Sequence, residues 1–100
     1  MNELTKHIDQ IRELCEANKV ASLFAFGSIT TNKFNSDSDI DLIIDIDEKD
    51  PLNYSDYYFE VKDQLSKILK RPIDLLELKT LKNSFLKKEI EQSKVLVYGR

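Results

Sequence analysis

Three aspartates stand inside or beside short apolar runs, where charged residues are uncommon. Asp39 and Asp41 lie at the start of the run 40–46, and Asp74 interrupts the run 73–78. Residues two apart in a strand point to the same side, about 6.7 Å apart, so Asp39 and Asp41 present two carboxylates together. Two carboxylates at that spacing repel each other, which indicates that a cation lies between them.

The composition restricts which cation this is. The chain has one histidine, His7, and one cysteine, Cys15, which excludes a zinc site built from a cluster of imidazole and thiolate ligands. Oxygen ligands favour Mg²⁺ (or Mn²⁺), and Mg²⁺ typically binds one or two carboxylates together with phosphate oxygens of a substrate. The aspartates therefore predict a magnesium site that also holds a phosphorylated substrate.

A glycine-serine pair provides a candidate phosphate contact. Gly27 and Ser28 end the apolar run 20–26, and ten residues separate Ser28 from Asp39. Glycine permits close approach of a phosphate to the backbone, and the serine with the following amides offers hydrogen-bond donors. Lys33 is the next basic residue and is predicted to contribute a further phosphate contact, with a weaker grip than the fork of a guanidinium group.

The pattern of apolar residues predicts an α+β fold. Helical spacing occurs over residues 3–17, about 53–69 and 81–90, while strand-like runs occur at 20–26, 40–46, 73–78 and 95–98. Asn53 or Ser55 is expected to cap the second helix. We expect a mixed sheet of about four strands with helices packed on it, in a single domain spanning residues 1–100.

The connections between the predicted strands bring the polar residues together. If the Gly27-Ser28 turn and Asp39 belong to one site, the first and second strands must be antiparallel neighbours. The third strand follows a long helix, and such a crossover places it parallel to the second strand. Asp74 then lies at the same end of the sheet as Asp39 and Asp41, so three carboxylates meet at one edge.

Charge and hydropathy exclude other classes of protein. The 41% apolar and 33% charged residues are typical of a folded soluble protein. No apolar run approaches the ~20 residues needed to cross a membrane, and the first residues do not resemble a secretion signal, so we expect a cytoplasmic protein with no membrane partner. The net charge of −3, with acidic residues concentrated in 37–50, argues against direct binding of nucleic acid.

These motifs resemble those of the DNA polymerase beta-like nucleotidyltransferase superfamily, and within it the stand-alone minimal nucleotidyltransferases. The resemblance covers nearly the whole chain and is carried by Phe26-Gly27-Ser28, Ser36-Asp37-Ser38-Asp39-Ile40-Asp41-Leu42, Ile73-Asp74-Leu75 and Val95-Leu96-Val97-Tyr98. It implies transfer of a nucleoside monophosphate, usually AMP from ATP, to an acceptor hydroxyl with release of pyrophosphate.

The resemblance also implies roles for individual residues. Asp39 and Asp41 match the metal ligands, and Gly27 and Ser28 match the triphosphate contact. Asp74 is similar to the third carboxylate, which completes a metal site and accepts the proton of the acceptor. In several members the acceptor is a tyrosine of a helical HEPN ribonuclease toxin encoded beside the transferase, which acts as the antitoxin. A HEPN-type partner is therefore expected here.

One departure from the family pattern favours an alternative function. Relatives commonly have a basic residue and a glycine soon after Gly-Ser, whereas this chain has Ile29-Thr30-Thr31-Asn32. A phosphate contact is thus missing from its usual place. The same fold could instead serve as a weakly active or inactive binding module that masks a partner protein.

Other interpretations of these residues remain open from the sequence. The acidic residues fall at positions one, three, five, nine and twelve of a calcium-binding EF-hand loop, although Leu42 occupies the glycine position and residues 29–36 lack a helical pattern. They could also form a solvated turn. Asp74 could pair with Arg71 or a lysine. The acidic positions are Asp37, Asp39, Asp41, Asp45 and Glu48, and the tyrosines expected to pack against the core are Tyr54, Tyr57 and Tyr58.

Overall fold

A four-stranded mixed sheet forms the centre of the computed structural model, which describes residues 1–82 and 84–99. The strands are β1 (Val20–Phe26), β2 (Ile40–Ile46), β3 (Ile73–Glu77) and β4 (Val95–Gly99). Their order is β3-β2-β1-β4, with β1 antiparallel to both β2 and β4, and with β2 parallel to β3. The mixed α/β fold expected from the sequence is confirmed.

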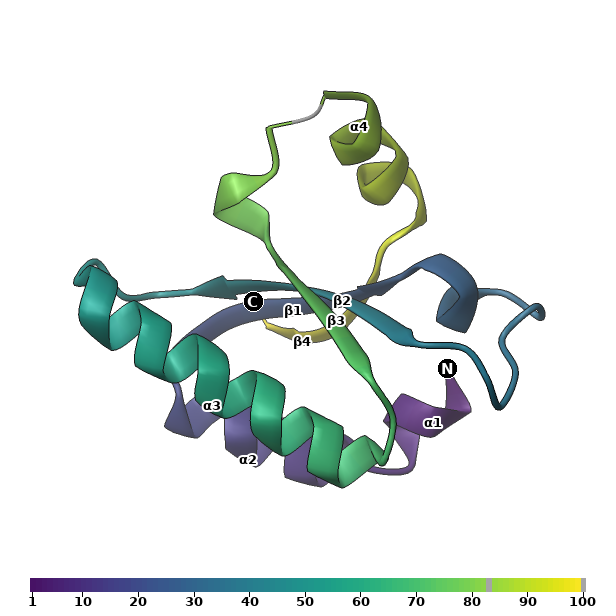
Figure 1. Ribbon diagram of the computed structural model, residues 1–100, viewed down its shortest axis with the longest axis horizontal. Helices are drawn as coiled ribbons and strands as arrows, with labels where there is room; N and C mark the ends of the chain where they lie inside the picture. The colour runs from purple at the N-terminus through teal and green to yellow at the C-terminus, as the bar shows by residue number, and fades with distance from the viewer. Residues whose placement is uncertain (83, 100) are drawn as a thin grey trace.

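Helices lie on both sides of this sheet (Figure 1). Figure 1 shows α2 and α3 against one face, while η2 and α4 arch over the other. We call these the helix-covered face and the open face. The helices are α1 (Asn2–Thr5), α2 (Ile8–Ala17), α3 (Pro51–Leu69) and α4 (Ser84–Ser93), with 3-10 turns η1 (Gly27–Thr30) and η2 (Leu78–Thr80).

The acidic side chains of strand β2 lie on one face of the sheet. Leu42 and Ile44 are fully buried in the core beneath α2 and α3. Successive side chains of a strand alternate between the two faces, so Asp41, Ile43 and Asp45 point to the open face. The main core is therefore confined to the helix-covered face, and the acidic residues of β2 lie on the other.

The N-terminal helix expected over residues 3–17 is divided in two. Helix α1 ends at Thr5 and α2 begins at Ile8, because His7 has φ −117° and ψ 20°, outside the helical region. Both parts still bury their apolar positions, since Leu4 and Ile11 are at most 1% exposed.

The start of α3 also differs from the prediction. The N-cap is Asp50, whose Oδ1 accepts a hydrogen bond of 2.9 Å from the Leu52 amide, and not Asn53 or Ser55. Pro51 occupies the first helical position, where its fixed φ suits the helix and its missing N–H removes no hydrogen bond. An Asp-Pro pair thus begins the helix.

The segment after β3 differs from the sequence-based expectation in where its strand and helix begin and end. The third strand ends at Glu77, one residue early, and the expected helix over 81–90 begins at Ser84; residue 83 lies outside the described residues. Ile90 is 2% exposed, whereas Phe85 is 71% exposed. The apolar spacing correctly indicated a helix but not which side chains it buries. Among residues 1–82 and 84–99, no helix is both long and apolar enough to span a membrane.

Candidate active site

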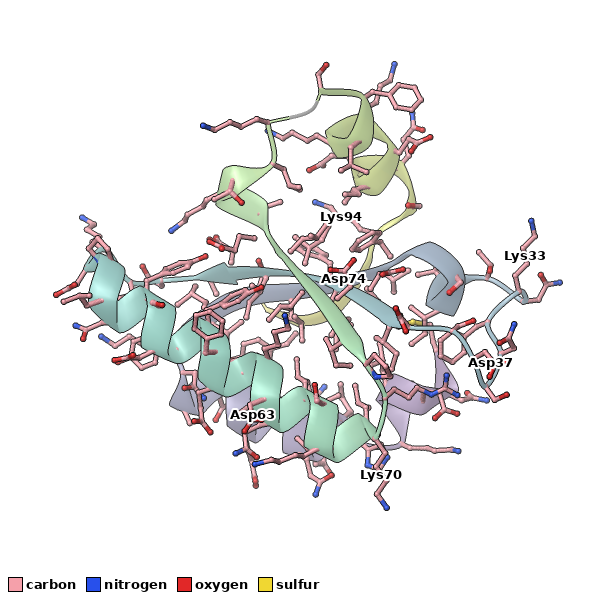
Figure 2. The ribbon with its side chains drawn as sticks, viewed as in Figure 1. Lys33, Asp37, Asp63, Lys70, Asp74 and Lys94 are labelled. Atoms are coloured by element: carbon pink, nitrogen blue, oxygen red, sulfur yellow. The ribbon has the colours of Figure 1, made fainter. Side chains whose placement is uncertain are left out.

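The three aspartates gather at one end of β2 and β3. Asp41 and Asp74 are direct partners in the parallel ladder between these strands, so their side chains stand side by side on the open face. Asp39 precedes β2 by one residue, and its charge acts on Asp41 from the same side. Figure 2 shows Asp74 on the side of the sheet toward α4. The structure therefore brings together the carboxylates that the sequence singled out.

Gly27 approaches the Asp41 carboxylate closely. Phe26 pairs with Asp41 across the antiparallel ladder, and Gly27 follows with φ +73°, in the left-handed region that glycine adopts without strain. A Cβ atom built on Gly27 would lie 2.6 Å from Asp41 Oδ2, closer than van der Waals contact allows. Glycine at this position therefore makes room for the Asp41 carboxylate itself, and any larger residue would displace it.

Asp41 lies in a strongly negative environment. Partial burial raises the pKa of its carboxyl group, and the charges of Asp74 and Asp39 raise it further. Asp45, by contrast, lies 3.5 Å from the Lys79 ammonium group. Within residues 1–82 and 84–99, no ion pair neutralises the Asp39, Asp41 and Asp74 group. The site is therefore a place where a cation would be bound favourably.

Arg71 holds the loop that carries Asp39. Its guanidinium group donates hydrogen bonds of 2.9 Å to the Asn35 carbonyl and 3.0 Å to the Ser38 carbonyl, and it lies 4.5 Å from the centre of the Phe34 ring. The alternative in which Arg71 pairs with Asp74 is wrong, because the guanidinium group is engaged by this loop. Sequence reasoning missed the role, since carbonyl acceptors on a distant loop leave no local sequence signal.

The two other predicted phosphate contacts lie in different places. Ser28 sits in η1 directly after Gly27, and its carbonyl accepts hydrogen bonds from the amide and the hydroxyl group of Thr31. Lys33 lies near the tip of the loop between η1 and β2, where Figure 2 shows it well apart from Asp74 and directed outward. The structure thus places Ser28 beside the aspartates but does not bring Lys33 to them.

The same geometry excludes the calcium-loop alternative. Seven of the residues proposed to wind around one calcium ion form the extended strand β2, so Asp41 and Asp45 are separated along a sheet. The preceding segment from Thr31 contains turns and no α-helix. The tyrosines pack against the core as expected, and the Tyr58 hydroxyl group donates to the Leu75 carbonyl.

The donor set suits a divalent metal with oxygen ligands. Asp39, Asp41 and Asp74 offer only carboxylate oxygens, and among residues 1–82 and 84–99 none of the three forms an ion pair. In the described part of the chain, however, no group of three His, Cys, Asp or Glu side chains forms a ready-made metal cage. A divalent metal bound here would therefore need ligands besides these carboxylates, such as phosphate oxygens of a substrate.

Comparison with known proteins gives matches over nearly the full chain. Residues 9–100 match the family model described as polymerase beta, nucleotidyltransferase. MJ1379 of Methanocaldococcus jannaschii, provisionally named a protein adenylyltransferase, is 31% identical, and the match covers 92% of this chain and 99% of that protein.

Solved structures show the same fold. One solved structure, provisionally described as a minimal nucleotidyltransferase, superposes with a TM-score of 0.75 at 21% identity, covering 92% of this chain and 90% of that one. One chain of a complex of a tri-AMPylated HEPN toxin with an MNT antitoxin from Shewanella oneidensis matches with a TM-score of 0.66 at 19% identity. The match covers 97% of the present chain and 73% of the chain in the complex. The site geometry agrees with the match of residues 9–100 to the family model and with the 31% identity to MJ1379. The chain therefore belongs to the polymerase beta nucleotidyltransferase family and is a nucleotidyltransferase.

Proposed function

We propose that this protein transfers AMP from ATP to a hydroxyl group of a partner protein, in a reaction that depends on Mg²⁺ (or Mn²⁺). The observation that carries the proposal is the pairing of Asp41 with Asp74 beside Gly27, which gathers carboxylates without an ion-pair partner among the described residues next to a glycine with positive φ. The provisional name of the MJ1379 relative, protein adenylyltransferase, supports AMP as the group transferred. A cytoplasmic location, where ATP is available, belongs to the same proposal.

Each residue of the site then has a distinct role. Asp39 and Asp41 hold the divalent metal, which when bound offsets the negative charge that develops on the phosphate oxygens. Gly27 and Ser28 lie against the triphosphate. Asp74 is more exposed than Asp41, so an acceptor hydroxyl group can reach it and transfer its proton to the carboxylate.

A helical HEPN-type protein is the proposed acceptor. The complex from Shewanella oneidensis contains a tri-AMPylated HEPN toxin with an MNT antitoxin, and one of its chains shares this fold. We infer that a tyrosine of such a partner receives AMP, and that the modification makes this chain an antitoxin.

The test combines the purified chain with radiolabelled ATP, Mg²⁺ and the HEPN-type protein encoded beside it. Label should appear on the partner with the intact chain and should be absent with Asp39→Ala plus Asp41→Ala. Replacement of the acceptor tyrosine by phenylalanine should also remove the label. Transfer by the double variant at the rate of the intact chain would refute the assignment of these residues.

A second function is favoured by one observation. No basic side chain stands in the segment Ile29–Asn32, and Lys33 is directed away from the aspartates. If phosphate binding is correspondingly weak, the chain acts by masking its partner. Tight partner binding and inhibition of its ribonuclease activity, with no label transfer at any metal or nucleotide concentration, would establish this alternative.

A further inference from the structure

Lys94 is a basic residue to which the sequence analysis assigns no role. It connects α4 to β4, and its backbone amide donates a hydrogen bond of 2.8 Å to the Ile90 carbonyl. Its ammonium group lies 4.3 Å from the centre of the Phe24 ring and 3.2 Å from Glu91 Oε1. The side chain is only 20% exposed. Lys94 is therefore held in a defined position.

The sheet register places Lys94 in line with the aspartates. Val95 pairs with Ala25, so Lys94 stands beside Phe26, the residue that pairs with Asp41 on its other side. Asp41 in turn pairs with Asp74. Adjacent strands lie about 4.8 Å apart, so the Cα atoms of Lys94 and Asp41 are separated by about two strand spacings, ~10 Å.

The Lys94 ammonium group also lies on the same face as these carboxylates. Leu23 and Ala25 are buried in the core of the helix-covered face, so Phe24 and Phe26 point to the open face. The ammonium group over the Phe24 ring is therefore on the open face too. Figure 2 shows Lys94 and Asp74 on the same side of the sheet, with Asp63 of α3 on the other. Helix α4, which precedes Lys94, also contacts η1, the turn that contains Gly27 and Ser28.

A nucleoside triphosphate bound at this site would be stabilised by a cation besides the metal. Its terminal phosphates are negatively charged, and the segment after Ser28 supplies no basic residue to meet them. Lys33 is directed outward from the loop tip. The Lys94 backbone stands beside the Gly27 end of β1, and its ammonium group lies over the Phe24 ring, so it offers those phosphates a positive charge on the face where the carboxylates lie.

We propose that Lys94 binds the terminal phosphates of the nucleoside triphosphate and replaces the basic contact missing after Gly27-Ser28. This inference rests on the proposed function. The Phe24 ring holds the ammonium group by a cation–π contact that does not neutralise its positive charge. The Glu91 side chain that pairs with Lys94 is 49% exposed, and ion pairs with such exposed carboxylates are weak. The Lys94 ammonium group can therefore exchange Glu91 for a phosphate at little cost in free energy.

The test measures binding of ATP and of AMP, each with Mg²⁺, by isothermal titration calorimetry on the full chain. Lys94→Met keeps the hydrocarbon stem that packs on Phe24 and removes only the charge. We expect it to weaken ATP binding about tenfold while changing AMP binding less than about twofold, because AMP lacks the terminal phosphates. Lys94→Arg should restore most of the ATP affinity.

Lys67→Met is the matched control. Lys67 also forms an ion pair within its helix, 3.0 Å from Asp63, but it lies on α3 at the opposite side of the sheet. Its removal changes the net charge equally and should leave the affinities for ATP and AMP unchanged.

The other outcomes separate the two proposals. Equal loss of ATP and AMP affinity in Lys94→Met would indicate a structural role and overturn the phosphate contact. Unchanged ATP affinity would overturn it as well, while leaving the proposed function intact. An intact chain that binds neither nucleotide with Mg²⁺ would refute the proposed function itself, and the role of Lys94 with it.

Discussion

The two faces of strand β2 have opposite chemistry although they belong to the same seven residues. Leu42 and Ile44 pack into the core under α2 and α3, whereas Asp41 points to the open face beside Asp74. The alternation of the strand places the main-core residues on one face and the carboxylates on the other, where Ile43 is also buried. Stability and activity should therefore respond to different substitutions in β2, even between adjacent residues.

The largest expected effect concerns activity alone. Asp39→Ala plus Asp41→Ala removes the proposed metal ligands, so AMP transfer should fall by at least about a thousandfold. Thermal unfolding of this variant should occur at or above the temperature of the parent, because two mutually repelling charges are removed. Measuring both properties on one preparation tests whether these two carboxylates are dispensable for folding.

The complementary change is Ile44→Ala on the helix-covered face. Ile44 is fully buried, and loss of its side-chain atoms leaves a cavity, so the free energy of unfolding should fall by about 3 kcal/mol. Urea denaturation gives this value. AMP transfer per folded molecule should remain close to that of the parent at a temperature where the variant is folded. A large loss of activity with full folding would show that the two faces are coupled.

Gly27→Ala should affect both properties, because Gly27 joins the sheet to the site. The φ of +73° and the 2.6 Å approach of the added Cβ to Asp41 Oδ2 predict a loss of about 2 kcal/mol in unfolding free energy, and a lower rate of AMP transfer. When Asp41 is also replaced by alanine, the added Cβ no longer meets the Asp41 carboxylate, so this steric contribution to the loss of stability disappears. The same substitution should then cost less stability, which a double-mutant cycle measures.

Arg71→Met tests the support of the loop that carries Asp39. Loss of the hydrogen bonds to the Asn35 and Ser38 carbonyls should lower the unfolding free energy by about 1 kcal/mol. It should also raise the concentration of Mg²⁺ needed for half-maximal activity, since Asp39 is less well positioned. Unchanged metal dependence would limit Arg71 to a role in stability.

The smallest expected effect is a pH-dependent gain in stability from Asp41→Asn. Because the folded state raises the pKa of Asp41, ionisation of this carboxyl group destabilises the fold as the pH rises through that pKa. The variant should be slightly more stable than the parent at neutral pH, and the difference should vanish at a pH below the pKa of an unperturbed aspartate. Asp37→Asn on the exposed loop is the control. A gain that does not depend on pH would contradict this explanation.

Several features of the fold were predictable because they depend on local patterns. The strand at 40–46 has the bounds expected from the sequence, because an apolar run with Leu42, Ile43 and Ile44 consecutive is typical of a central strand. The break at His7 and the Asp50 cap were missed, since both depend on backbone conformations that periodicity does not report. The burial of Ile90 but not Phe85 depends on how α4 approaches the sheet.

The sequence by itself determined the family, the strands and the positions of the three aspartates, because these follow from residue type and spacing along the chain. Only the tertiary structure decided which distant side chains share the site. Arg71 reaches the loop before Asp39, Lys94 stands in register with Asp41 through Phe26, and Lys33 points elsewhere. Such contacts depend on register and on the packing of segments far apart in the chain, and neither is encoded in local periodicity.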